Sequence, residues 1–67
     1  MTVGTKIQQT IASCESALAS LDSFALETND QAAKTMFKSL AQQQKTILDQ
    51  LNSRLQYVQQ EEPQYNQ

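Results

Sequence analysis

The feature that most constrains this chain is a repeat of apolar residues at steps of four and three, which occurs twice with a short polar break between. Side chains at this heptad spacing lie on one face of an α-helix, so the pattern predicts two amphipathic helices, at about residues 5–27 and about 30–60. The first stripe contains Ile7, Ile11, Cys14, Leu18, Leu21 and Ala25, and the second contains Phe37, Ala41, Gln44, Leu48, Leu51, Leu55 and Val58.

Further apolar residues widen both stripes. Val3, Ala17 and Phe24 flank the first stripe, and Leu40 and Ile47 flank the second. The second helix therefore has a face broader than a two-stranded coiled coil uses. A face of this width is typical of a helix that touches two neighbours.

The break between the stripes is polar and predicts a tight turn. Thr28, Asn29 and Asp30 are all favoured at helix starts, and Asn29 also tolerates the left-handed conformation that ends many helices. A turn at residues 28–30 makes the two helices antiparallel neighbours.

The outer ends of the helices are predicted from capping residues and proline. Thr5 heads a capping-box sequence at the start of the first helix, with Thr2 as a competing cap. Residues before proline are disfavoured in helices, so Pro63 predicts that the second helix stops near Gln60 and that residues 61–67 fray. The chain is read as a single helical-hairpin domain, residues 1–67.

The size of the chain indicates self-association. Ordering a chain of 67 residues costs on the order of 100 kcal/mol, and a lone hairpin buries too little apolar surface to offset this. The longer second helix would also leave Leu55 and Val58 on an overhang with little cover. We therefore expect an all-α antiparallel two-helix hairpin that self-associates, as a homodimeric four-helix bundle or a larger homo-oligomer, with Leu55 and Val58 extending the contact.

Two seam residues are unusual for an apolar core. Gln44 lies between Ala41 and Leu48, where a buried amide can set register and oligomeric state. Partial exposure and a ligand contact are the other interpretations of Gln44. Cys14 is interpreted as a small packing residue, because it lies mid-helix beside Glu15, far from the positive charge that a reactive thiolate needs. A disulfide across a symmetric dimer is the alternative.

Composition argues against catalysis. The chain has no histidine, one cysteine and one glycine, which excludes intrachain zinc sites, Cys/His nucleophile pairs, disulfides and glycine-rich phosphate loops. We therefore assign no catalytic, cofactor-binding or metal-binding residue, and expect no cofactor and no enzyme activity.

Charge and hydropathy exclude two partner classes. The net charge is −2, with −3 on residues 1–33 and +1 on residues 34–67, so the clustered positive charge of a nucleic-acid binder is missing. The two helices would instead place acidic and basic flanks side by side. No apolar run approaches the roughly 20 residues of a membrane span, and no secretory signal is recognised, so we expect a cytoplasmic protein without direct membrane insertion.

Four phrases together resemble a known family. These are MTVGT at residues 1–5, FALET at 24–28, AKTMF at 33–37 and EEPQY at 61–65. Their order and spacing resemble the family called domain of unknown function 1657, small proteins of spore-forming Firmicutes, over essentially the full length. The resemblance implies a sporulation context, often beside genes for the spore-stage channel that moves dipicolinic acid and for small membrane proteins. It implies no activity and no functional residues.

The sequence leaves several functions open. The leading one is a structural or interaction protein of the sporulating cell or spore, and the next is an adaptor for a different protein, such as a spore membrane complex. Tyr57 and Glu61 match the loose Y-x-x-x-D/E pattern of helical-hairpin export substrates, whose Trp-x-Gly turn is missing here. Residues 33–51 loosely resemble a ferritin-like helix in which Gln44 and Ile47 replace the metal ligands, which would make the chain a metal-free relic.

Overall fold

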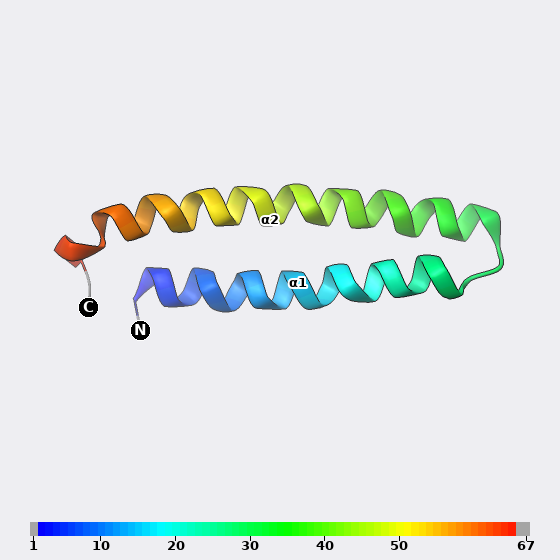
Figure 1. The fold of residues 1–67 in the computed structure, drawn as a ribbon, viewed down its shortest axis with the longest axis horizontal. Helices are drawn as coiled ribbons and strands as arrows, with labels where there is room; N and C mark the ends of the chain where they lie inside the picture. The colour runs from blue at the N-terminus through cyan, green and yellow to red at the C-terminus, as the bar shows by residue number, and fades with distance from the viewer. Residues whose placement is uncertain (1, 66–67) are drawn as a thin grey trace.

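The protein is an antiparallel hairpin of two helices, which confirms the all-α prediction. The computed structural model describes the backbone of residues 2–65 and the side chains of residues 2–61. Helix α1 (Val3–Glu27) is joined to helix α2 (Gln31–Tyr65) through residues 28–30. The helices lie side by side, with the turn at one end and the two chain termini at the other, where α2 extends past the start of α1 (Figure 1).

The heptad stripes form the seam between the helices. The most deeply buried apolar side chains belong to five seam residues, spread along the whole length: Ile11, Ala25, Ala41, Leu48 and Val58. Partly buried seam positions lie between them, namely Ile7, Cys14, Leu18, Leu21, Phe37, Gln44, Leu51 and Leu55. The seam is thus the only core that one hairpin of residues 2–61 has, and none of its larger side chains is completely enclosed.

The molecule is one helix thick. Its Cα atoms extend 51 × 17 × 10 Å, and their radius of gyration is 15.4 Å, whereas a globular chain of this length would have about 11 Å. Domains usually consist of at least two packed layers of secondary structure. This hairpin is a single layer, so both of its broad faces are uncovered.

Helix α1 begins earlier than its capping-box sequence predicted. Thr2 is the N-cap, because its Oγ1 accepts a hydrogen bond from the Thr5 backbone N–H at 3.0 Å, and Thr5 lies inside the first turn. The Thr5 hydroxyl bonds the Thr2 hydroxyl at 2.9 Å. Thr2, which the sequence offered as the alternative cap, is therefore the N-cap of α1. This earlier start adds Val3 and Gly4 to α1. Gly4 is buried, so the added residues pack against α2.

The turn lies where it was predicted, but it has a different conformation. The backbone of Thr28 is extended, and its hydroxyl accepts a hydrogen bond from the Asp30 N–H at 3.3 Å. Asp30 then caps α2, with its Oδ2 accepting from the Ala33 N–H at 3.2 Å. No positive φ occurs in the described part of the chain, so Asn29 does not adopt the left-handed conformation. Threonine and aspartate side chains satisfy the turn instead.

Helix α2 does not stop near Gln60 as predicted, since its backbone is helical to Tyr65. A proline removes one backbone hydrogen bond and disfavours the helical conformation of the residue before it, and this can kink a helix without ending it. The ribbon accordingly leaves the axis of α2 in its final turn (Figure 1). Residues 66 and 67 of the predicted tail lie outside the described residues.

The expectation that Leu55 and Val58 lack cover within one chain was wrong. Val58 is only 9% exposed in a single hairpin and Leu55 is partly buried. Helix α1 starts at Val3, two residues earlier than expected, and this extends the seam toward the end of α2. The contact of these two residues with a second chain stays a prediction.

Candidate interaction surface

The hairpin has two broad faces, one on either side of the seam. Each heptad has two seam positions. In an antiparallel helix pair, the residues just before one seam position meet on one side of the seam, and the residues just after the other seam position meet on the opposite side. The first set here includes Val3, Ala17, Phe24, Leu40 and Ile47. The second set includes Glu15, Asp22, Lys38 and Lys45. We call the two sides the apolar face and the charged face.

The apolar face exposes large hydrophobic side chains from both helices. Leu40 is 38% and Ile47 is 43% exposed, although each adjoins a residue that is at most 8% exposed. Met36 lies one turn before Leu40, and Tyr57 lies one turn after Arg54. Both point toward the outer edge of this face and are also exposed. The large exposed side chains of this face are Val3, Phe24, Met36, Leu40, Ile47 and Tyr57.

Aromatic contacts mark the two ends of the apolar face. Near the turn, the rings of Phe24 and Phe37 are 5.4 Å apart at their centroids and inclined at 52°. Near the open end, the guanidinium carbon of Arg54 lies 4.8 Å from the centroid of the Tyr57 ring, a cation–π contact. Phe24 thus packs across the seam on Phe37, whereas the Tyr57 ring lies along its own helix beside Arg54.

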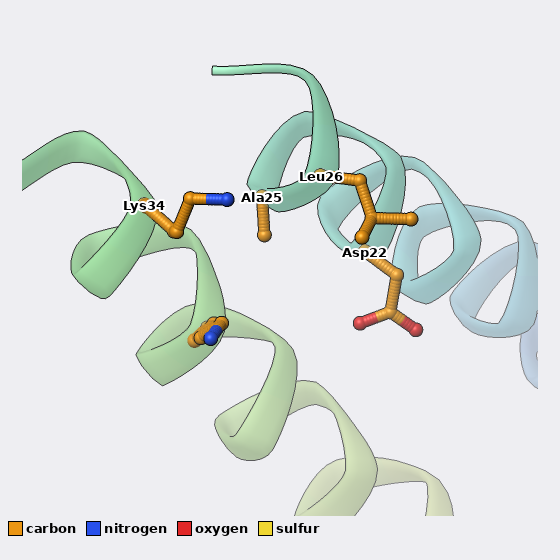
Figure 2. Close-up of a pocket in the computed structure, with 5 residues that line it drawn as sticks. Asp22, Ala25, Leu26 and Lys34 are labelled. Atoms are coloured by element: carbon orange, nitrogen blue, oxygen red, sulfur yellow. The ribbon is translucent and has the colours of Figure 1, made fainter. Parts of the chain in front are cut away.

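The charged face carries the complementary flanks expected from the sequence. Its acidic residues come from α1 and its lysines from α2, and Asp22 and Lys38 line one shallow pocket together with Ala25, Leu26 and Lys34. Figure 2 shows Lys34 reaching from α2 toward Ala25, while the Asp22 carboxylate points away from it. Leu26, at 82% exposure, is an isolated apolar residue beside this pocket. Solvated charges make this face a poor site for apolar packing.

A polar contact crosses the seam at its centre. The Gln44 side-chain Nε2 donates a hydrogen bond to the Cys14 backbone carbonyl at 3.1 Å. The contact joins the middle of α2 to the middle of α1, so it places these two residues at the same level along the hairpin. Gln44 is partly exposed, as one of its interpretations expected, and its role in setting register and oligomeric state stays a prediction. The Cys14 thiol is free and partly buried.

The predicted site residues divide into two groups in the structure. All the predicted seam residues line the interhelical contact. The expected place of Leu40 in the core or interface of a four-helix bundle stays a prediction, and in one hairpin this flanking residue is exposed on the apolar face. The reason is its heptad position, directly before the buried Ala41. Sequence reasoning missed Met36, whose spacing of four residues from Leu40 is the signal that could have found it.

The described residues show neither a metal-binding cluster nor a membrane-spanning helix. No group of three or more His, Cys, Asp or Glu side chains suited to a metal ion occurs there. Over the same residues, neither α1 nor α2 has a stretch with the length and hydropathy that crossing a membrane requires.

Fold and surface together define a two-helix hairpin protein with one uncovered apolar face. The family model described as "Protein of unknown function (DUF1657)" matches residues 7–55, and the chain belongs to this family. The matched region starts at the seam residue Ile7, ends at the seam residue Leu55 and includes the turn. No curated protein and no solved structure shows significant similarity to the chain.

Proposed function

We propose that the protein is a non-enzymatic structural or interaction protein that acts by self-association, most simply as a homodimeric four-helix bundle. The observation that carries the proposal is the apolar face, which exposes large side chains of both helices on a layer whose Cα atoms span only 10 Å in thickness. A second layer packed on this face would complete the two-layer arrangement that isolated domains usually have.

The exposed surface area supports a missing partner. The chain exposes 4823 Å², whereas a compact monomer of 7.5 kDa exposes about 4200 Å². Contiguous apolar surface on a chain this small is characteristic of protein–protein contacts. Self-association is the simplest source of such a contact, because every copy of the chain supplies the same face.

The biological setting is part of the proposal. The family resemblance implies a sporulation context, and we place the assembly in the cytoplasm of the sporulating cell or in the spore. There it would have a structural role or act with a spore membrane complex. Its action would need no cofactor, nucleic acid or direct insertion into the membrane.

The experiment is a measurement of mass against concentration by light scattering or sedimentation. The wild-type chain should have at least twice the monomer mass of 7.5 kDa at micromolar concentrations. Leu40→Asp should weaken association at least about tenfold, because it buries a charge in the contact between chains. Ser39→Asp is the matched control, since it adds the same charge at the neighbouring exposed position.

A wild-type chain that stays monomeric at these concentrations would contradict the proposal. That outcome would favour the adaptor function, with the same face covered by a different protein. Equal weakening by Leu40→Asp and Ser39→Asp would show that added charge, and not the apolar face, governs association.

A further inference from the structure

We propose that the apolar face is covered by a second copy of this chain turned end for end, so that the turn of each hairpin lies over the open end of its partner. This inference rests on the proposed self-association and names its geometry. The charges at the two ends of the face and the spacing of its apolar residues favour this occupant.

Opposite charges mark the two ends of the apolar face. Glu27 is at the turn end of α1, and Lys6 lies three heptads earlier on the same side of that helix. Arg54 is at the open end of α2, one heptad after Ile47 and therefore on the same side as Ile47 and Leu40. All three charged side chains are exposed. Glu61 follows one heptad after Arg54, beyond the start of α1, so the part of the face that both helices form is basic at its open end and acidic at its turn.

Two symmetric stackings of the apolar faces are possible, and these charges distinguish them. If both turns lie at the same end, Arg54 comes near the partner's Lys6, and Glu27 comes near the partner's Asp30. If the hairpins are turned end for end, each helix lies over the same helix of its partner. Arg54 then comes near the partner's Asp30, and Glu27 comes toward the partner's Lys6. The first stacking places like charges together and the second pairs opposite charges. Rim charges of this kind select orientation more than they add affinity.

The apolar residues fit the same two-fold axis. On α2, Leu40 and Ile47 lie symmetrically about the midpoint between Gln43 and Gln44, so an end-for-end copy places Leu40 against the partner's Ile47. On α1, Val3 and Phe24 lie symmetrically about the midpoint between Ser13 and Cys14.

These two midpoints lie at the same level of the hairpin. The hydrogen bond from Gln44 to the Cys14 carbonyl, at 3.1 Å, joins the residues beside them. One axis through the centre of the molecule therefore pairs the large side chains of both helices at once. The smaller Thr10 and Ala17 occupy the middle of the face on α1, where the two layers would approach most closely.

Distances between spin labels in the dimer test the orientation. In the Cys14→Ser chain, a label on Asn29→Cys should be about 45 Å from its copy in the end-for-end dimer, from a rise of 1.5 Å per residue. With both turns at one end the separation should be under about 20 Å. A label on Ser16→Cys, near the centre, is the control and should give a short distance in either dimer.

Charge reversal gives a second, independent measurement. Glu27→Lys should weaken dimerisation several-fold at low salt, because it faces the partner's Lys6 at the open end of α1, and adding Lys6→Glu should restore it. The hairpin should stay folded in Glu27→Lys, because a positive charge in the last turn of α1 favours the helix.

The possible failures are distinguishable. A chain of monomer mass without coupling between labels would overturn the proposed self-association itself. A dimer with a short Asn29 distance, or one that the double charge reversal does not restore, would overturn only the end-for-end geometry.

Discussion

Gln44 interrupts an otherwise apolar stripe on α2, and its amide spans the seam to the backbone of α1. A hydrogen bond between neutral groups contributes about 1 kcal/mol net, comparable to the gain from burying a leucine more fully at the same position. Its contribution is therefore mainly to alignment, since only one level of α1 against α2 satisfies it. The Cys14 carbonyl also lies within the regular hydrogen bonding of α1, so removal of the amide leaves it paired.

Gln44→Leu should raise the free energy of unfolding by up to about 1 kcal/mol, because apolar surface replaces a half-buried amide. Urea denaturation followed by circular dichroism measures this change. The same variant should form a less uniform set of assemblies by light scattering, because the alignment is no longer specified. Gln43→Leu, at the exposed neighbouring position, is the control. A loss of stability on Gln44→Leu would show that the hydrogen bond outweighs packing.

At the scale of the elements, short side chains determine where each helix begins. Thr2 starts α1 and Asp30 starts α2, each by accepting a backbone N–H of the first turn, and Thr28 bridges the connection between them. Asp30 also places a negative charge at the positive end of the dipole of α2. The connection is thus built from side-chain oxygens, and it needs neither glycine nor a left-handed residue.

Asp30→Ala should lower the free energy of unfolding by about 1 kcal/mol through loss of this cap. Asn29→Ala, at the adjacent exposed residue, should change it by less than about half of that. Urea midpoints of the two variants, measured side by side, check the expectation. Equal losses would mean that the turn as a whole, and not the cap, controls the start of α2.

The elements differ in how far their sequence determines them. The seam was predictable because residues such as Ile11 and Leu48 repeat at helical spacing, and the polar break left one position for the turn. The start of α1 was not predictable, because Thr2 and Thr5 are equivalent caps until the packing of the residues between them is known. The end of α2 was misjudged because a proline this near a terminus can bend a helix without stopping it. The flanking position of Leu40 followed from its place directly before Ala41, and its contact with a second chain stays a prediction.

The whole molecule is a single layer with a thin seam. Small residues such as Ala25 and Ala41 occupy several of its most buried positions, so the helices lie close but bury little area per residue. A single hydrophobic core in a chain of this size rarely supplies more than about 3–5 kcal/mol of stability. Folding and association should therefore be coupled, with stability that rises with protein concentration.

Leu48→Asp should abolish both helicity and association, because an unpaired charge at a position only 8% exposed costs several kcal/mol. Ile47→Asp, one residue earlier and 43% exposed, should weaken association without removing the helical signal at high concentration. Circular dichroism and sedimentation over a range of concentrations separate these effects. If both variants unfolded alike, the distinction between seam and apolar face would be wrong.

The burial of Val58 has a kinetic consequence. Because the helices run antiparallel from one short turn, contacts near residues 28–30 close small loops, while covering Val58 closes a loop of nearly the whole chain. The entropy lost on closure grows with the logarithm of loop length, so the contacts become steadily more costly with distance from the turn. The contacts between the two helices should therefore form first near the turn and last at the free ends. On unfolding, the contacts at the free ends should break first.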